Sequence, residues 1–489
     1  MAMSSLIKSL EDTMRTDAGL NGDAQYIEQI TWLLFLKAFD AKEQEWEIKA
    51  LMDGISYEPI IPKGYRWRDW AEQKEGITGD DLITFVDDLF KKLIDLKTKN
   101  NDAKSFVVSN VFEDINNYMK SGVNLRNLIN KINEKVDFID ATKKHTFNDL
   151  YEGMLKDLQS AGNAGEFYTP RPVTNFIVEK VNPKLGEKIL DPACGTGGFL
   201  TSTINFLGEV SSVEELEKLQ NSVYGWEKKP LPYLLAMTNL ILHDIEIPQI
   251  SHKNSLATPL SCYGGSDKVD VIVANPPFGG NEDQSIKNNF PKKYQTKETA
   301  DLFLALMMNL LKENGRCGLV LPDGFMFGDG VKNTLKKELL DEYNLHTIIR
   351  LPQVFKPYAD VRTNLLFFEK GKKSEGIWVY RLDMPEGQKN FTKTKPMEDK
   401  HFDPVREWWD NKISLYDEEG NPKAKFYSYD ELVATNGINL DFSRCCPLPQ
   451  KEEEILTPND AIEKYKNRKQ ELNQQIDNIL DEVKKLLEE

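Results

Sequence analysis

The amino-acid sequence predicts an α/β fold, a Rossmann-like doubly wound sheet preceded by an N-terminal helical domain. Short apolar runs alternate with segments of helical periodicity from about residue 165 to residue 370. Residues 269–274 are apolar almost throughout, as is typical of a central parallel strand. Before about residue 150, apolar residues instead recur at three- and four-residue spacing. These observations favour a parallel sheet with ligand sites at the carboxyl ends of its strands.

The individual elements follow from this alternation. Helices are predicted in the N-terminal part at residues 5–14, 26–39, 82–96 and 123–132. Strands are predicted at residues 188–191, 223–226, 269–274, 317–321, 347–351 and 364–368. Helices are expected between these strands at residues 199–207, 234–242, 302–311 and 335–340. We therefore divide the chain into a helical domain (1–150), an α/β domain (151–375), a region of unassigned fold (376–456) and a C-terminal helix (457–489).

The predicted C-terminal helix has a heptad pattern. Thr457 suits its N-cap and Pro458 its first helical position. The positions on alternating three- and four-residue steps are apolar except for one lysine: Ile462, Tyr465, Lys469, Leu472, Ile476, Ile479, Val483 and Leu486. The pattern fits a helix that docks on a partner, and it fits equally a helix that packs on its own chain.

The composition excludes several classes of protein. The 489 residues include 40% hydrophobic and 29% charged residues, which is ordinary for a globular protein. No apolar run reaches the ~20 residues of a membrane span, and no signal peptide is evident, so we expect a cytoplasmic protein. Five cysteines and five scattered histidines argue against a disulfide framework and against a metal site.

The first candidate site is the segment Asp191-Pro-Ala-Cys-Gly-Thr-Gly-Gly-Phe199, between a strand and a helix. Glycines in such a turn let the backbone approach a ligand closely, because they have no Cβ. The segment lacks the lysine of a phosphate-binding loop, so nucleotide hydrolysis is disfavoured. The next strand ends at Glu227, whose carboxylate can accept hydrogen bonds from ribose hydroxyls. Glu227 lies further from Asp191 along the sequence than the usual ~20 residues. We expect residues 209–222 to form an additional helix or loop that accounts for the difference.

The second candidate site is Asn275-Pro276-Pro277-Phe278, which follows the central apolar strand and should lie beside the glycine-rich turn. The N6 amino group of adenine is a poor nucleophile because its lone pair is delocalised into the ring. The Asn275 side-chain oxygen and a backbone carbonyl, both accepting from this group, would aim the lone pair at an electrophilic methyl group. The prolines stiffen the backbone, and Phe278 offers a ring on which an extruded base can stack. The motif therefore predicts methyl transfer to adenine.

With both motifs in place, the sequence resembles the DNA adenine-N6 methyltransferases, and among them the modification subunits of type I restriction–modification systems. The cofactor motif precedes the catalytic motif with no reading domain between them, which looks like the gamma order. Residues 26–37, 165–171, 321–324 and 351–355 are also similar to segments of these subunits. The resemblance covers roughly residues 20–370, and the tail is similar in kind.

The resemblance implies a site-specific, adenine-specific DNA methyltransferase that uses S-adenosyl-L-methionine. The motif at 165–171 would close over the methionine end of the cofactor, Glu227 would bind its ribose, and Asn254 stands where the family commonly has an aspartate near its adenine. The implied cofactor-binding residues are Glu166, Phe167, Tyr168, Thr169, Asp191, Ala193, Gly195, Thr196, Gly197, Gly198, Glu227, Asn254 and Ser255. The implied catalytic residues, which would hold the target base, are Asn275, Pro276, Pro277 and Phe278.

Two features near the motifs have a less definite interpretation. The polar segment after the catalytic motif carries Lys287, Lys292, Lys293 and Lys297, which could meet DNA phosphates or belong to a solvated loop. Cys194 in the glycine-rich turn is interpreted as a small filler, since no histidine is near it in sequence and the reaction needs no thiol.

Two alternative functions stay open at this point. Methyltransferases that act on RNA guanine or on protein glutamine share an Asn-Pro-Pro motif, but they usually have Tyr at its fourth position and lack a large helical domain. A scaffold subunit that has lost its activity is the second alternative, and the intact motifs argue against it.

Partner subunits are expected from the charge. The net charge is −16, whereas DNA binding depends on Lys and Arg residues that neutralise phosphates. No segment resembles a domain that reads base edges in the major groove of double-stranded DNA. The resemblance implies two copies of this chain with one specificity subunit, and a restriction subunit in the full complex.

Overall fold

The computed structural model describes residues 3–99, 102–136, 169–208, 210–355, 361–388, 390–392, 395–434 and 437–441, together with Lys466 and Lys469. Residues Met1–Asp441 form one compact unit and Phe442–Glu489 a second. Lys466 and Lys469 are helical, and the rest of the predicted C-terminal helix lies outside the described residues.

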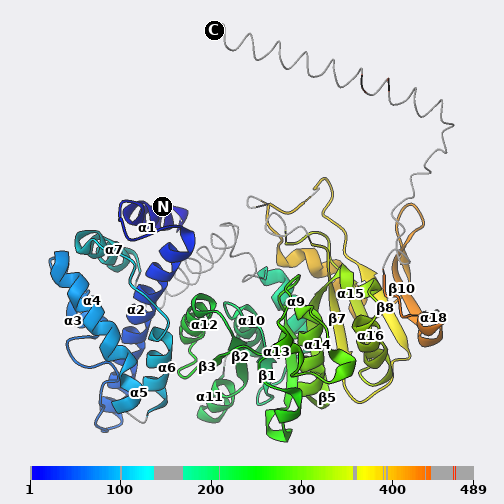
Figure 1. The fold of residues 1–489 in the computed structure, drawn as a ribbon, viewed down its shortest axis with the longest axis horizontal. Helices are drawn as coiled ribbons and strands as arrows, with labels where there is room; N and C mark the ends of the chain where they lie inside the picture. The colour runs from blue at the N-terminus through cyan, green and yellow to red at the C-terminus, as the bar shows by residue number, and fades with distance from the viewer. Residues whose placement is uncertain are drawn as a thin grey trace. The chain divides into compact units, whose positions relative to one another are not determined.

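The N-terminal part is helical, as predicted (Figure 1). Its helices are α1 (Met3–Arg15), α2 (Asp23–Met52), α3 (Trp67–Trp70), α4 (Gly79–Ile94), α5 (Leu96–Lys99), α6 (Ala103–Phe112) and α7 (Gly122–Lys135). The long helix α2 carries a nearly continuous buried stretch that includes Trp32, Phe35 and Phe39. Their burial explains why a helix of this length is stable in water, since packing supplies most of a helix's stability.

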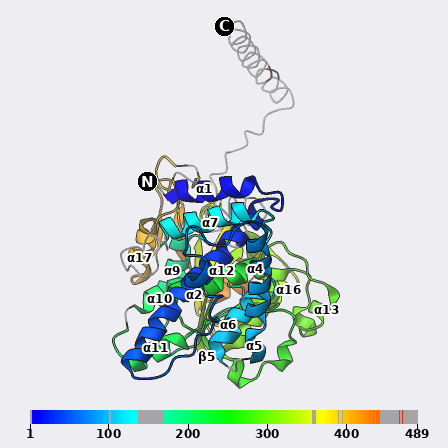
Figure 2. The ribbon, with the colours of Figure 1, turned by 90° about the vertical axis from the view of Figure 1, so that its left-hand side faces the viewer.

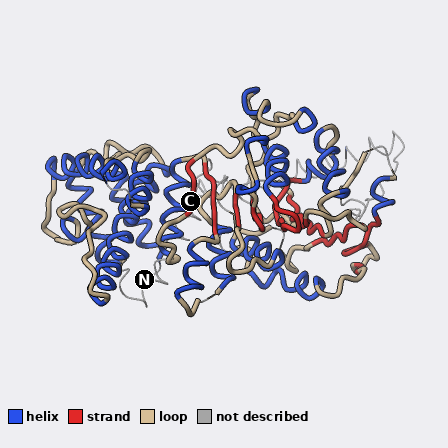
Figure 3. Tube along the Cα trace, turned by 90° about the horizontal axis from the view of Figure 1, so that it is seen from below, coloured by secondary structure: helices blue, strands red, loops and turns tan. Residues whose placement is uncertain are grey.

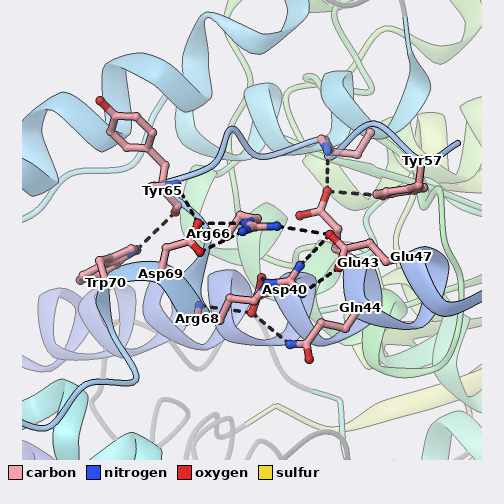
Figure 4. A network of polar contacts seen from close by, with 12 residues as sticks. Asp40, Glu43, Gln44, Glu47, Tyr57, Tyr65, Arg66, Arg68, Asp69 and Trp70 are labelled. Carbon is pink, nitrogen blue, oxygen red and sulfur yellow. Dashed lines mark hydrogen bonds and ion pairs between the residues drawn. The ribbon is translucent and has the colours of Figure 1, made fainter. Parts of the chain in front are cut away.

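A network of charged side chains fastens the segment around α3 onto α2 (Figure 4). The guanidinium group of Arg68 lies 3.0 Å from a carboxylate oxygen of Asp40 and 2.9 Å from one of Glu47. Arg66 lies 3.3 Å from Glu47 and 2.8 Å from Asp69. The arginines thus neutralise the acidic face of α2.

Glu43, on the same helix, lies deeper. Its side chain accepts a hydrogen bond from the backbone N–H of Ile60 and a longer one, 3.4 Å, from the hydroxyl of Tyr57. The residue is fully buried, and this burial, together with the nearby carboxylates of Asp40 and Glu47, raises the pKa of Glu43 to about 7. The helical domain therefore contains a buried carboxyl group that titrates near neutral pH.

The α/β part is built on one ten-stranded sheet with the order β3-β2-β1-β4-β5-β7-β6-β8-β10-β9. The strands are β1 (Ile189–Asp191), β2 (Val223–Glu227), β3 (Gln249–His252), β4 (Val269–Ala274), β5 (Leu311–Pro322), β6 (Thr347–Arg350), β7 (Thr363–Glu369), β8 (Gly376–Arg381), β9 (Leu415–Tyr416) and β10 (Pro422–Ser428). The first five strands of this order are parallel, whereas β7 is antiparallel to β5 and β6 and β10 is antiparallel to β8 and β9. Figure 3 shows the strands following one another between helices.

The helices of this part include counterparts of the four predicted between the strands, at residues 199–207, 234–242, 302–311 and 335–340, and others that were not predicted. The helices of this part are α9 (Arg171–Val181), α10 (Gly198–Leu207), α11 (Val213–Gln220), α12 (Pro230–Leu242), α13 (Gln284–Lys287), α14 (Thr299–Leu310), α15 (Asp323–Phe327), α16 (Val331–Asp341), α17 (Asp403–Trp409) and α18 (Tyr429–Val433). Short 3-10 helices lie at η2 (Leu260–Cys262), η3 (Gly265–Asp267), η4 (Lys292–Tyr294) and η5 (Asp399–Phe402). Residues 209–222, expected to be a helix or loop, contain α11. Among the described helices, none is long and apolar enough to cross a membrane.

Both faces of the sheet are covered, as two adjacent residues of β7 show. The ring of Phe367 contacts Phe176 of α9 at 6.2 Å. The ring of Phe368 contacts Tyr343 just after α16 at 6.0 Å, and the Tyr343 hydroxyl donates to the carbonyl of Met308 in α14. Because successive side chains of a strand point to opposite faces, α9 lies on one face and the α14 and α16 pair on the other. The doubly wound prediction is confirmed, with β7 as an antiparallel insertion.

The sheet extends beyond the strands that the sequence predicted. The predicted series ended at residues 364–368, but β8, β9 and β10 continue the same sheet within the region whose fold the sequence left unassigned. β3, at the opposite edge of the sheet, was also not predicted. β3, β9 and β10 are short or mixed in polarity, so they lack the apolar runs that marked the central strands. β8 does contain an apolar run, at residues 377–380, and the sequence prediction missed it.

The helical domain shares a hydrophobic core with this sheet, because α2 packs against α12 (Figure 2). Ion pairs join Lys42 to Asp244 at 2.5 Å and Lys104 to Glu246 at 3.0 Å. Through α12 the helical domain reaches the glycine-rich turn, whose Gly197 lies against Ala236.

Candidate active site

The glycine-rich turn (residues 192–197) joins the end of β1 to the first residue of α10. Gly195 and Gly197 have φ angles of 53° and 79°, which lie in the left-handed region that favours glycine. A Cβ on Gly197 would lie 3.2 Å from a side-chain carbon of Leu240 in α12. Two features therefore favour glycine at position 197: its φ angle is positive, and a neighbouring helix lies close to its backbone.

Hydrogen bonds hold this turn in one shape. The N–H of Cys194 donates to the carbonyl of Trp226 at 3.1 Å, and the N–H of Gly197 donates to the carbonyl of Cys194 at 2.8 Å. On the other side, the buried amide of Asn239 donates to the carbonyl of Thr196 at 3.0 Å. The turn is thus fixed from both β2 and α12.

Cys194 fills space within this turn. It is buried, and a Cβ on Gly225 would come within 2.9 Å of its Sγ atom. Burial raises the pKa of the thiol well above its usual value, which disfavours the reactive thiolate. The interpretation of Cys194 as a small filler is therefore confirmed by its packing.

Asp191 supports the turn from behind. Its Oδ1 atom accepts a hydrogen bond from the N–H of Ala193 at 3.0 Å, and the side chain is buried. Burial, with a smaller effect from Glu227, raises the pKa of Asp191 to about 8. Asp191 does not line the cavity described below, whereas Ala193 does. Asp191 would therefore influence a ligand indirectly, by holding the turn in place and through the charge of its carboxylate.

Glu227, the last residue of β2, closes the turn from the next strand. Its Oε2 atom accepts from the N–H of Gly195 at 3.0 Å, and its Oε1 atom accepts from the N–H groups of Lys228 and Lys229 at 2.8 and 2.7 Å. Burial raises the pKa of Glu227, and these three hydrogen bonds oppose the rise. A carboxylate has about four acceptor positions, so one remains for a ligand.

The segment after β3 contributes two of the predicted residues. Asn254 uses its side-chain oxygen to accept from the N–H of Leu256 at 3.0 Å, which leaves its amide nitrogen for other contacts. The Ser255 hydroxyl donates to the carbonyl of Pro192 at 2.5 Å. Ser255 thereby ties this segment to the glycine-rich turn.

Asn275 follows the last residue of β4, next to β1 in the sheet. Its amide nitrogen donates to the Thr169 hydroxyl at 2.9 Å. Its Oδ1 atom is buried and has no hydrogen-bond partner. Pro276 is buried and Pro277 exposed, whereas Phe278 is half-buried against one of the cores of the sheet. The motif therefore presents an unsatisfied acceptor next to an aromatic ring.

These elements enclose a cavity of about 280 Å³ at the carboxyl ends of β1, β2 and β4. Eight of the residues predicted from sequence line it: Ala193, Gly195, Glu227, Asn254, Ser255, Asn275, Pro277 and Phe278. Other predicted residues shape the turn or the motif without lining the cavity: Thr169, Asp191, Thr196, Gly197, Gly198 and Pro276. Glu166, Phe167 and Tyr168 lie outside the described residues.

The cavity also has walls that the sequence analysis missed. Trp226 lines it, with its ring stacked on Tyr263 at 5.8 Å and the Lys253 ammonium 3.6 Å from its ring centre. Glu282 and Phe303 line it from the segment after the catalytic motif and from α14. Trp226 precedes Glu227 at the end of a strand. This position is the one sequence feature that could have indicated a lining residue here.

Arg171, in the segment 165–171 that resembles the family, was not predicted to be a site residue. Its guanidinium donates to the carbonyl of Gly198 at 2.8 Å and to the Thr201 hydroxyl at 2.9 Å. It thereby joins the start of α9 to the start of α10.

The lysine-rich segment after the catalytic motif is structured. It contains α13 and η4, and its residue Asn281 is bridged to Glu298. Lys293 is paired with Glu338 of α16 at 2.8 Å. In the described part of the chain, no group of three or more His, Cys, Asp or Glu side chains gathers as a metal site.

Comparisons with known proteins fit this geometry. Residues 142–454 match the family model described as N-6 DNA Methylase, and residues 3–132 match the HsdM N-terminal domain. The chain is 48% identical over 480 residues to the methylase subunit of the type I restriction enzyme EcoEI from Escherichia coli, covering 96% of both chains.

Solved structures give the same result. A modification subunit assigned to a type I restriction enzyme of Vibrio vulnificus YJ016 is 44% identical, with a TM-score of 0.80 over 90% of this chain and 96% of that one. A chain from a type I R-M system studied for its complex assembly is 35% identical, with a TM-score of 0.77 over 99% and 98%. With a glycine-rich turn, a strand-end carboxylate and an Asn-Pro-Pro-Phe motif meeting at one cavity, the chain belongs to the N-6 DNA methylases, as a methylase subunit of the type I restriction enzymes, and is an adenine-specific DNA methyltransferase.

Proposed function

We propose that the cavity receives S-adenosyl-L-methionine beside an adenine extruded from DNA, and that Asn275 accepts a hydrogen bond from the N6 amino group. The supporting observation is the buried Oδ1 atom of Asn275, which has no partner. Leaving a buried acceptor unpaired costs about 1–3 kcal/mol. A ligand with an N–H donor at this position would recover that energy, and the adenine amino group is such a donor.

The residues around the cavity suit the cofactor. S-adenosyl-L-methionine supplies an electrophilic methyl group on a positively charged sulfonium. Glu227 retains one acceptor position for a ribose hydroxyl. The charged side chains of the lining are balanced, since Glu227 and Glu282 line the cavity together with Lys228 and Lys229. Trp226 offers a flat apolar wall, and Asn254 a free amide nitrogen, for the cofactor's adenine.

The chain's own residues would then act by position and electrostatics. Asn275 holds the amino group so that its lone pair turns away from the base, and Phe278 stacks on the base. The backbone of the glycine-rich turn fixes the methionine part of the cofactor, while Asp191 and Ser255 keep this turn in place.

We further infer that DNA specificity comes from a separate subunit, in an assembly of two copies of this chain with one specificity subunit, joined by a restriction subunit in the full complex. The net charge of −16 supports this, because the excess of carboxylates opposes binding to phosphates, and Lys293 of the segment after the catalytic motif is paired with Glu338. We also infer a cytoplasmic location, where the host DNA is found.

Substitution of Phe278 tests the base site. Methylome sequencing of the host first identifies the target sequence. The chain and its specificity subunit are then incubated with labelled S-adenosyl-L-methionine and a duplex that contains this sequence. Phe278→Ala should reduce turnover by about 1–3 kcal/mol, because it removes the stacking ring, whereas Phe278→Trp should be milder. Equal rates for the two variants would refute the stacking role. The label must appear on DNA adenine, and its absence there would refute the proposed function.

A further inference from the structure

An exposed lysine lies beside the cavity, in the segment that follows the catalytic motif. The carbonyl of Lys297 accepts a hydrogen bond from the N–H of Glu282 at 2.8 Å. Glu282 lines the cavity together with Asn275, the first residue of the motif. Since the Lys297 side chain is exposed, its ammonium group lies in solvent close to the catalytic motif.

An exposed arginine lies at the same edge of the sheet. Arg362 directly precedes β7, and its carbonyl accepts a hydrogen bond from the N–H of Asp323 at 3.0 Å. Asp323 directly follows β5 and Asn275 directly follows β4, and these two strands are parallel neighbours. Parallel strands have their carboxyl ends at one edge of a sheet, where ligands bind. Arg362 and the catalytic motif therefore lie at one edge, with the end of β5 between them.

The carboxylates next to Lys297 are engaged with other groups. Glu298 is paired with Lys332 of α16, and the Glu282 carboxylate accepts a hydrogen bond from the Thr299 hydroxyl at 3.1 Å. Within the described part of the chain, no carboxylate forms an ion pair with Lys297. The charge of Lys297 is therefore not neutralised by a contact of its own.

Arg362 is in the same situation. Asp323, whose N–H group it binds through its carbonyl, uses both carboxylate oxygens for other partners. One oxygen accepts from Arg350 at 3.1 Å and the other accepts from the amide of Asn364 at 2.8 Å. Among the residues that the structure describes, no carboxylate forms an ion pair with Arg362.

The place of these two cations matches the path of DNA phosphates. An adenine that is extruded from a duplex stays attached to the phosphates on either side of it, so these phosphates approach the edge of the sheet with it. Lys and Arg are the side chains that neutralise DNA phosphates. The net charge of the chain is −16, so local positive charge near the catalytic motif is decisive for a contact with DNA.

We propose that Lys297 and Arg362 bind the DNA phosphates next to the extruded adenine. The inference rests on the proposed function, because it assumes that an adenine of DNA enters the cavity. It distinguishes Lys297 from Lys293 of the same segment, whose ammonium group is already paired with Glu338 at 2.8 Å. It also adds Arg362, which the sequence did not indicate as a site residue.

The dependence of DNA binding on salt tests the proposal. The chain with its specificity subunit is titrated with a duplex that contains the target sequence, in the presence of S-adenosylhomocysteine and at several salt concentrations. Lys297→Gln and Arg362→Gln should each reduce the slope of log affinity against log salt by about 0.9, as expected for one lost phosphate contact. Lys297→Arg and Arg362→Lys keep the charge and should keep the slope.

Two matched controls remove other exposed charges. Lys293→Gln removes a lysine of the same segment that Glu338 already neutralises. Lys372→Gln removes a lysine that follows β7, at the opposite edge of the sheet, and that is paired with Glu369 at 3.2 Å. Both variants should keep the slope of the wild-type chain.

A neutral methylphosphonate in place of the phosphate on either side of the target adenine locates the contacts. In the wild-type complex, neutralising a contacted phosphate should weaken binding by about two- to fivefold, the range of an exposed ion pair. The variant that lacks the matching cation should lose no further affinity with that duplex, because the interaction is already gone.

Several results would overturn the proposal. Unchanged slopes in Lys297→Gln and Arg362→Gln would show that neither residue meets a phosphate, and equal reductions in the two controls would show a general effect of charge. Additive losses from substitution and methylphosphonate would place the cations away from the target base. Failure of the variants to co-purify with the specificity subunit would assign the cations to the protein interface instead.

Methylation of DNA adenine by the wild-type complex, measured in parallel, separates this inference from the proposed function. If the label reaches adenine while the slopes stay unchanged, only the phosphate contacts are refuted. If no label reaches adenine, the proposed function fails and the phosphate contacts fail with it.

Discussion

Glu227 and Gly195 are joined by a hydrogen bond of 3.0 Å from the backbone N–H of the glycine to the carboxylate. The contact links the end of β2 to the glycine-rich turn after β1, two elements that both line the cavity. Since Glu227 also accepts from Lys228 and Lys229, one carboxylate holds the glycine-rich turn and the end of β2 together at the cavity.

Replacing Glu227 by Gln should therefore weaken cofactor binding strongly. The amide keeps the size of the side chain but turns one acceptor into a donor, which then faces a backbone N–H group. Loss of a hydrogen bond to a charged group is worth about 1.5–3 kcal/mol, so the dissociation constant for S-adenosyl-L-methionine should rise by about tenfold or more. Isothermal titration measures this. Glu282→Gln, in another carboxylate of the cavity lining, is the matched control and should have the smaller effect. Unchanged affinity in Glu227→Gln would mean that another group holds the ribose.

Cofactor affinity should depend on pH through Asp191. Its pKa is raised to about 8 by burial, so the carboxyl group is largely protonated at neutral pH in the unliganded chain. A bound cation favours the carboxylate, and binding then releases a proton. Affinity for S-adenosyl-L-methionine should accordingly rise from pH 6 to pH 8, by at most about tenfold per pH unit.

Asp191→Asn should flatten this pH profile. S-adenosylhomocysteine lacks the sulfonium charge and should show a weaker dependence in the wild-type chain. A profile that is equally steep in Asp191→Asn would assign the titrating group elsewhere.

The buried Glu43 makes a separate prediction about stability. The pKa of Glu43 is raised from 4.5 to about 7, so between these values the folded chain binds more protons than the unfolded chain. Folding stability from this group therefore falls as the pH rises through that window, by about 3 kcal/mol in total.

Glu43→Gln, which stays neutral, should thus be more stable than the wild-type chain at pH 8, and this gain should shrink toward pH 5. Thermal unfolding of both chains at several pH values measures the difference. Glu45→Gln, an exposed carboxylate on the same helix, is the control and should show no such trend. A gain that is constant with pH would contradict the burial of a titrating carboxyl group at this position.

The heptad pattern at residues 457–489 fits a helix that docks on a partner or one that packs on its own chain, and docking makes a testable prediction. Its removal should reduce assembly with the specificity subunit more than it reduces folding, because the apolar seam would lose its partner helices. Thermal unfolding of the truncated chain and its co-purification with the specificity subunit separate the two effects. A large fall in melting temperature with assembly intact would show instead that the helix packs on its own chain.

The central strands and the motifs could be predicted because they carry strong local signals in the sequence. The apolar run of β4 indicates a buried strand, and the glycines indicate a tight turn. Gly197 has a positive φ angle and a close neighbour, and both favour glycine at this position. The strand β3 was missed, since a short strand at the edge of a sheet needs no long apolar run. β8 lies between β6 and β10 and has an apolar run at residues 377–380, and it was missed because the predicted series of strands ended at residue 368.

Contacts between distant residues could not be anticipated. The hydrogen bond from Asn275 to Thr169 depends on how α9 lies against the end of β4, and the clamp of Arg171 on Gly198 depends on how α9 meets α10. Nor did the sequence reveal that Asp191 lies behind the turn while Glu227 lines the cavity, because both are acidic residues at strand ends.

Asn275→Ala tests whether Asn275 accepts a hydrogen bond from the adenine amino group. The chain with its specificity subunit is saturated with labelled S-adenosyl-L-methionine, and methyl transfer to the target duplex is followed in a single turnover, with cofactor affinity measured by titration on the same preparation. Loss of a preorganised hydrogen-bonding group should slow the transfer step by about 2–4 kcal/mol, while the dissociation constant of the cofactor stays within about twofold of the wild-type value. A near-normal transfer rate in Asn275→Ala would contradict the account.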